Sequence, residues 1–388
     1  MTGLLDRRTI LLAWLGYTLL ALGVTWPLAI HLNQVPHDLG DPLLSTTLLW
    51  WNAHHWPLSA EWWNGPWFYP APGALAFSDP RLGASLLATP LQWIGLTPLA
   101  AYNLTLLASF PASAMAAFAE VWGAESDQQW HHVMGHRARF IALWGKLIGA
   151  APGTLTTTEN VTQSLHMLMT ALPAKRLKGK RVLVAGDCFP SNHFLLTELA
   201  GRLGFRLDTV PLRQGASWVE DEDMIARWDG DVALALLTWV NSTTSHRIDL
   251  DRLAAHGRAK GSLIGVDITQ AAGLLPFSVE TPKVDFAIST SLKWMCGTPG
   301  AGILQVSGDL IPQCQPELRG WFSQDNPFNW RLDTFALAPD IRRFDNGTPS
   351  IMACAASLPA LEWHAAQDHV ALLAHNRKLG ARIQQGIG

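Results

Sequence analysis

The stretch Ser289-Thr-Ser-Leu-Lys-Trp-Met-Cys-Gly-Thr-Pro-Gly-Ala-Gly302 places Lys293 just after a strand-like apolar run, Val284-Asp-Phe-Ala-Ile288. A second strand-like run, Ser262-Leu-Ile-Gly-Val-Asp267, ends on an aspartate. In an α/β sheet, residues that follow the carboxyl ends of parallel strands meet at one edge. The sequence therefore predicts that Lys293 and Asp267 share a site.

A lysine and an aspartate in this relation are what pyridoxal 5'-phosphate (PLP) requires. Lys293 is the predicted catalytic residue, because its amine can form a Schiff base with the cofactor's aldehyde. Asp267 can pair with the pyridinium nitrogen and keep it protonated, so that the ring can act as an electron sink. PLP is therefore the predicted cofactor.

The phosphate of PLP needs an anion site of its own. Residues 156–169 are polar and then apolar at helical spacing, which predicts a helix N-terminus with free N–H groups. Val161, through its amide, and Thr162 are the predicted contacts. Thr348 is a further candidate for the phosphate.

The ring of PLP also has candidate partners. Phe189 follows a strand-like run and could stack on the pyridine. Thr238 ends the next run and could reach the phenolic oxygen. Gln270 lies three residues after Asp267 and is expected at the same place.

Strand and helix patterns alternate from about residue 137 to the end of the chain. This alternation predicts an α/β domain with a mostly parallel sheet and flanking helices, for example over 191–203 and 250–260. The continuous apolar character of most runs predicts strands that are covered on both faces. The predicted strands are 181–186, 206–211, 231–238, 262–267, 284–289 and 302–306.

At this point residues ~120–388 resemble the class V aminotransferase family of fold-type I PLP enzymes. Two branches of the family matter for this sequence: the kynureninases, and the cysteine desulfurases with epimerase-like members. Glu159-Asn-Val-Thr-Gln-Ser-Leu-His166, Phe189-Pro-Ser191 and Gly320-Trp-Phe-Ser323 resemble kynureninases, and Trp321 is taken from this pattern as a cofactor contact. The resemblance implies an amino acid substrate and a homodimer with active sites at the subunit interface. Three segments carry the resemblance to the class V family: Val266-Asp-Ile-Thr-Gln-Ala-Ala-Gly273, Lys293-Trp-Met-Cys-Gly-Thr-Pro-Gly-Ala-Gly302 and Arg343-Phe-Asp-Asn-Gly-Thr348.

Two positions depart from the kynureninase branch. Leu292 stands where that branch has tyrosine, and Gln270 stands where it has histidine, whereas glutamine is typical of cysteine desulfurases and epimerase-like members. The reaction therefore stays open among transamination, C–C or C–S bond cleavage, and epimerisation. Compared with the family, the PLP domain is expected to be incomplete at both ends, with a truncated small domain.

The first 119 residues have a different character, with no lysine and only three arginines, Arg7, Arg8 and Arg81. The uncharged segment 9–30 is long enough for a membrane span, and 82–119 could form one span or two. Two domains are thus expected: a membrane segment over 1–119 with two or three apolar helices and a Trp-rich loop, and the PLP domain over 120–388. Arg7 and Arg8 predict a cytoplasmic N-terminus for a chain at the inner or plasma membrane. One further span would return the PLP domain to the cytoplasm, where PLP is made and where the domain is expected, whereas two further spans would place it outside.

Two rival readings rest on this N-terminal part. Residues 40–55 and 66–76 resemble the first extracytoplasmic loop of multi-span glycosyltransferases that use polyprenyl-linked sugars, and Asp41 matches that family's acidic residue. In the simpler interpretation Asp41 only caps the following helix. The chain could also join a glycosyltransferase fragment to a PLP-enzyme fragment and be catalytically inactive.

Composition excludes several other classes. A net charge of −3 and a pI near 6.5 give no reason to expect nucleic acid as a partner. The four cysteines form no CxxC pair, which argues against a zinc site. His131, His132 and His136 are interpreted as surface residues, so no metal site is predicted.

Overall fold

The computed structural model describes residues 7–36, 41–67, 75, 81–117 and 129–387. It divides into two compact units, one formed by Met1–His132 with His375–Gly388 and the other by Val133–Ala374. The predicted domain boundary between residues 119 and 120 lies outside the described residues.

The larger unit is built on one sheet, which has seven strands in the described part of the chain, in the order β1-β7-β6-β5-β4-β2-β3. Strands β3, β2, β4, β5 and β6 are parallel neighbours, and β7 runs antiparallel to both β6 and β1. The fold is therefore α/β with a mostly parallel sheet, as predicted. The strands are β1 (Leu155–Thr158), β2 (Arg181–Ala185), β3 (Arg206–Val210), β4 (Val232–Thr238), β5 (Leu263–Asp267), β6 (Phe286–Thr290) and β7 (Gly302–Val306).

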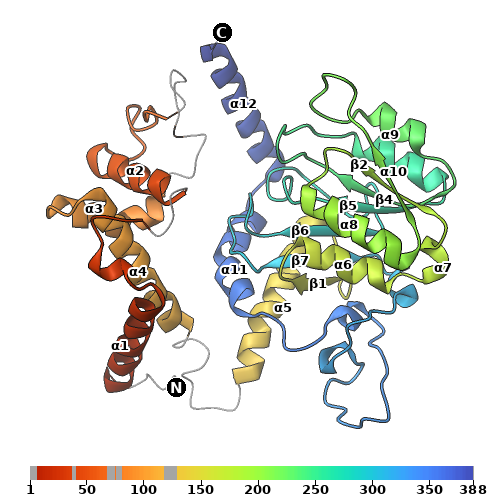
Figure 1. Cartoon of the computed structure of the whole chain (residues 1–388), viewed down its shortest axis with the longest axis horizontal. Helices are drawn as coiled ribbons and strands as arrows, with labels where there is room; N and C mark the ends of the chain where they lie inside the picture. Colours follow the sequence, from red (N-terminus) through yellow and green to blue (C-terminus); the bar gives the residue numbers. More distant parts are fainter. Residues whose placement is uncertain (1–6, 37–40, 68–74, 76–80, 118–128, 388) are drawn as a thin grey trace. The chain divides into compact units, whose positions relative to one another are not determined.

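Helices cover both faces of this sheet (Figure 1). Along β2, Val182 and Val184 pack into a core with α6, α7 and α8, while Leu183 packs into a second core with α5, α10 and α11. This alternation explains why the strands read as continuous apolar runs, because each face is buried. These helices are α5 (Gln129–Ile148), α6 (Val161–Ala171), α7 (Ala174–Leu177), α8 (Pro190–Leu203), α9 (Asp221–Arg227), α10 (Leu250–Ala259) and α11 (Met352–Ala365). Helix α12 (His369–Ile387) follows α11, and its residues from His375 onward are grouped with the unit that begins at Met1. Short 3-10 helices are η4 (Ile311–Gln313), η5 (Trp321–Ser323) and η6 (Ile341–Phe344).

The start of α6 differs from the prediction. The threonines at 156–158 belong to strand β1, whereas a helix N-terminus was expected there. Threonine is β-branched and packs well in a strand, and the antiparallel partner β7 completes the hydrogen bonding. The helix begins at Val161 instead, because the side chain of Asn160 accepts the N–H of Gln163 at 2.9 Å and caps it.

The smaller unit is helical. Two small cores hold it, one around Leu48 and Trp62 and the other around Leu49, Ala88 and Ala101. Asp41 is the first residue of its second helix, where the helix dipole favours a carboxylate. Its elements are α1 (Arg7–Val24), η1 (Leu28–Ile30), α2 (Asp41–His54), α3 (Leu82–Trp93) and α4 (Pro98–Ala117).

The predicted membrane spans over 9–30 and 82–119 are not supported. Among the described residues, no helix is both long enough and apolar enough to cross a membrane. The helix over the first segment ends at Val24, shortly before Pro27, and its 18 residues correspond to a length of about 27 Å, short of the hydrocarbon core. The second segment is broken between Trp93 and Pro98 into α3 and α4.

Candidate active site

Seven of the nine predicted site residues line one cavity of about 310 Å³ in the larger unit. Strands β4, β5 and β6 end at the edge of the sheet where the cavity opens, and the segments after them carry its polar groups. Strand β1 has the same direction as β6, since both are antiparallel to β7, so α6 starts at the same edge. The seven residues are Val161, Thr162, Phe189, Thr238, Asp267, Gln270 and Lys293.

Asp267 is the electrostatic centre of this cavity. Its carboxylate is 6 % exposed and accepts hydrogen bonds from the N–H of Thr269 at 3.0 Å and from Nδ2 of Asn192 at 2.9 Å. Burial raises the pKa of Asp267, and these hydrogen bonds oppose the shift. In the described part of the chain no basic side chain forms an ion pair with this carboxylate, so it can accept a cationic ligand.

Asn192 was not singled out by the sequence analysis. It lies in the first turn of α8, is fully buried, and holds one oxygen of Asp267 while its own Oδ1 has no hydrogen-bond partner. In the sequence, only its position could have indicated a role at the site: Asn192 ends the segment Asp187-Cys-Phe-Pro-Ser-Asn192, which follows a predicted strand. A polar residue at the start of the next helix reaches the same sheet edge as Asp267.

Three threonine hydroxyl groups belong to the cavity wall, and two of them have unused bonding capacity. In the described part of the chain the Oγ1 atoms of Thr238 and Thr290 are buried without a hydrogen-bond partner, and both residues line the cavity; the third hydroxyl, that of Thr269, is directed at Asp267. Buried polar atoms are normally satisfied, so their gathering at one cavity indicates a polar ligand. A ring with a phenolic oxygen and a cationic nitrogen fits these groups and Asp267, and the residues present therefore fit PLP.

Lys293 lies on a tight turn that follows β6. The N–H of Cys296 donates to the carbonyl of Lys293 at 2.9 Å, and Cys296 has a left-handed φ of 54°. The Lys293 side chain is exposed to the cavity and solvent. Beside it, Nε1 of Trp294 donates to Oε1 of Gln270 at 3.1 Å. Since an indole can only donate, the Gln270 oxygen is used by this bond and its amide N–H groups are left for a ligand.

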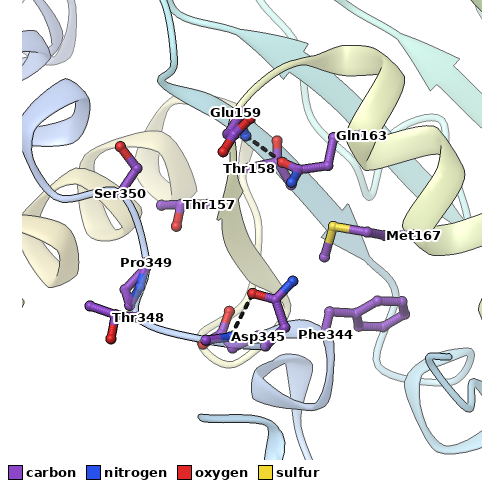
Figure 2. Close-up of a pocket in the computed structure, with 12 residues that line it drawn as sticks. Thr157, Thr158, Glu159, Gln163, Met167, Phe344, Asp345, Thr348, Pro349 and Ser350 are labelled. Carbon is purple, nitrogen blue, oxygen red and sulfur yellow. Dashed lines mark hydrogen bonds between the residues drawn. The ribbon is translucent and has the colours of Figure 1, made fainter. Parts of the chain in front are cut away.

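Thr348 and Trp321 do not line the Lys293 cavity. Thr348 is exposed and lines a smaller pocket of about 80 Å³, whose lining also includes Thr157, Glu159 and Gln163 (Figure 2). Trp321 is half-buried and packs against exposed aromatic rings of its own segment, Phe328 and Trp330.

These two residues nevertheless belong to one connected piece of structure. The N–H of Phe322 donates to the carbonyl of Asn346 at 3.2 Å, which joins the Trp321 segment to the Thr348 segment. The buried guanidinium of Arg137 fixes the Thr348 segment, because it bonds Oδ1 of Asp345 at 2.8 Å. Trp321 and Thr348 are therefore held together, outside the cavity of their own chain.

The comparison with protein families decides the assignment. Residues 142–388 match the family model of class-V aminotransferases. The chain belongs to the class V aminotransferase family. Curated relatives within this range include the kynureninases of Monosiga brevicollis and Deinococcus radiodurans, each 29 % identical to 62 % of this chain. These matches cover 56 % and 55 % of the two relatives, so the chain spans about half the length of the kynureninases that it matches.

Solved structures resemble this chain in fold. A cysteine desulfurase from Thermococcus onnurineus NA1 aligns with a TM-score of 0.60 and 19 % identity, over 69 % of this chain and 66 % of that one. C-DES, solved with glycine covalently linked to its PLP cofactor, aligns with a TM-score of 0.56 and 22 % identity, over 63 % of each chain. At these identities the likeness establishes the fold. The expected cofactor class is confirmed, since relatives in this family depend on PLP.

Proposed function

We propose that the chain binds PLP in the Lys293 cavity and acts on an amino acid as a PLP-dependent enzyme of the class V family. The observation that supports this most strongly is Asp267, a buried carboxylate without a cationic partner that shares one cavity with Lys293. When bound, PLP supplies an aldehyde for an amine and a ring that withdraws electrons. Each remaining role falls to a residue of this chain.

Asp267 holds a proton on the ring nitrogen, because its ionised form is favoured once a cation faces it. Asn192 and the Thr269 N–H keep the carboxylate in place. Lys293 would hold the cofactor through its amine, and this amine can carry the proton of the substrate's α-carbon. The positive end of α6, with Val161 and Thr162, binds the phosphate.

The proposal includes a homodimer, in which each copy contributes residues to the site of the other. Trp321 and Thr348 lie on one connected piece outside their own chain's cavity, where a second copy can present them to the partner's cofactor. The neighbouring segment exposes a group of apolar side chains that such contact would bury: Leu318, Phe328, Trp330, Leu332 and Phe335.

The reaction type stays open among transamination, C–C or C–S bond cleavage, and epimerisation. Similarity to kynureninases favours C–C cleavage. Gln270 departs from the kynureninase pattern and resembles the glutamine typical of cysteine desulfurases and epimerase-like members. The alternative of an inactive join of two fragments predicts no cofactor binding at all. Glycosyl transfer through Asp41 is ranked last, because the position of Asp41 at the first residue of α2 is explained by the helix dipole.

The test is a borohydride reduction of the purified full chain after incubation with PLP, followed by peptide mass spectrometry. The proposal predicts a phosphopyridoxyl group on Lys293, and none on the exposed control Lys283. Label spread evenly over surface lysines would refute the site. The reduced and unreduced proteins are then screened against kynurenine, cysteine and alanine, and only the unreduced protein is expected to form product.

A further inference from the structure

His364 is a buried histidine that the proposed function does not use. It lies near the end of α11, is 3 % exposed, and neither ring nitrogen forms a hydrogen bond of good geometry in the described part of the chain, although backbone groups of Trp294 and Gly273 lie close to the ring. Buried polar groups without partners are uncommon and call for an explanation. The ring stands beside two segments of the candidate active site.

One of these segments is the Lys293 loop (residues 291–297) and the other is the Asp267 turn (residues 268–273). Gly273 has a φ of 86°, and a Cβ atom placed on it would come within 2.8 Å of Sδ of Met295 and 2.9 Å of Cε1 of His364. The imidazole, the Met295 thioether and the Gly273 backbone are therefore in direct contact. His364 thus fills the space between the two segments that carry the predicted cofactor contacts.

The charge state of His364 is set by its surroundings. Burial lowers its pKa, the charge of His369 acts in the same direction, and the backbone groups of Trp294 and Gly273 oppose both. His369 faces it from the start of α12, with ring centroids 6.1 Å apart, and Nε2 of His369 is also buried without a partner.

Other charged groups on the elements around His364 are already engaged or are site residues. On α11, Glu362 pairs with Arg139 of α5 at 2.8 Å, and Lys146 of α5 donates to the carbonyl of Ala365 at 3.1 Å. The Lys293 loop contributes Lys293 and Cys296, Asp267 precedes the Asp267 turn, and Asp368 precedes His369.

We infer that His364 is a positioning residue for Lys293: its neutral imidazole sets the spacing between the Lys293 loop and the Asp267 turn, and its protonation loosens the loop. A charged imidazole has two N–H donors to satisfy, and the buried ring can satisfy them only if backbone carbonyls or water move to meet it. The Lys293 loop is the segment that can move, since Lys293, Trp294 and Cys296 are exposed and only Met295 of this turn is buried. This inference uses the proposed function only in taking Lys293 as the site lysine.

The test is hydrogen exchange of the full chain without cofactor, from about pH 7.5 to about pH 5.5, corrected for the intrinsic pH dependence of exchange. Peptides that cover residues 289–302 are expected to exchange at least about threefold faster at the lower pH in the wild type. In His364→Gln, which keeps a neutral polar group of similar size, the pH response is expected to disappear. His256→Gln is the matched control, because His256 is half-buried on α10 and bonded to the carbonyl of Trp228.

A second readout links the loop to the cofactor site. PLP affinity is expected to fall more steeply toward low pH in the wild type than in His364→Gln, and any pH dependence that the two proteins share cancels in this comparison. If His364→Gln does not fold, His369→Gln replaces it: removing the facing charge should shift the loosening of the loop to higher pH. A wild-type loop whose exchange does not respond to pH, or the same response in His364→Gln, would overturn the inference. Absence of PLP binding with a normal loop response would instead count against the proposed function.

Discussion

Asp267 shows how one residue can be costly for folding and needed for binding. The carboxylate is buried and lacks a cationic partner, and burial raises its pKa above the ordinary value of 3.8. A raised folded-state pKa means that stability is fully present below that ordinary value and is lost as pH rises through the folded-state value. At neutral pH the cofactor-free chain therefore bears the cost of an ionised Asp267, and a cationic ligand would offset it.

The variant Asp267→Asn separates these two effects. The melting temperature of the cofactor-free protein is expected to stay equal or rise, because the charge is gone and the Asn192 amide can turn over, so that its Oδ1 accepts from the new amide while the new oxygen still accepts from the Thr269 N–H. PLP affinity is expected to fall at least tenfold, or about 1.4 kcal/mol. Thermal denaturation and a PLP titration measure both, and a lowered melting temperature with unchanged affinity would contradict the account.

Lys293, Asp267 and Gln270 were predictable because their chemistry is read from residue type and from position after a strand. Asn192 and the Trp294–Gln270 bond were not, because they depend on which side chains of separate segments face each other. Thr238 was predictable only in part. The end of its strand was predicted correctly, but only the structure shows that its hydroxyl lacks a partner.

At the scale of elements, the N-terminus of α6 joins stability to binding. Asn160 caps the helix, and Val161 and Thr162 line the cavity. Asn160→Ala is expected to lower the free energy of unfolding by about 1 kcal/mol through loss of the cap. Asn160→Asp keeps a good cap but adds a negative charge beside the phosphate, so stability should be unchanged while PLP affinity falls about tenfold. Chemical denaturation and PLP titration of both variants check this, and equal affinity in Asn160→Asp and wild type would argue against a phosphate there.

Strand β5 gives a prediction about the core. A Cβ atom at Gly265 would lie 1.9 Å from Cζ of Phe286, which is fully buried on β6. Gly265→Ala is therefore expected to destabilise the larger unit by about 1–3 kcal/mol. Gly230→Ala is the control, since nothing lies within 4 Å of its added Cβ. Urea denaturation compares the two, and equal midpoints would show that β5 and β6 are less tightly packed than described.

The predicted strands matched well where they were apolar runs, and the run at 302–306 coincides with β7. Strand β1 was missed because four residues, three of them threonines, carry no apolar periodicity. The antiparallel direction of β7 could not be predicted either, because it depends on the path of the turn between Lys293 and Gly302. In the N-terminal part, the lack of charge indicated membrane spans. The helices end at Val24 and at Trp93, however, and an uncharged sequence alone does not show where a helix ends.

At the scale of the whole molecule, the proposed homodimer makes each site depend on two chains. Lys293→Ala removes the lysine of one cavity, and Thr348→Ala removes a contact offered to the other. If both copies contribute, mixing the two variants after subunit exchange should restore about a quarter of the wild-type sites, because half of the dimers are hybrids with one intact site each. PLP binding of the mixture measures this. No recovery in a mixture that exchanges subunits would place Thr348 outside the site.

The central claim is that Lys293 and Asp267 form a PLP site, and an absorbance spectrum tests it most directly. The purified full chain is mixed with PLP beside Lys293→Ala, with Lys283→Ala as the matched control on an exposed ion pair. The account predicts a visible band of protein-bound PLP in the wild type and in Lys283→Ala, and its loss in Lys293→Ala. Folded wild-type protein without that band, or a band that survives in Lys293→Ala, would contradict it.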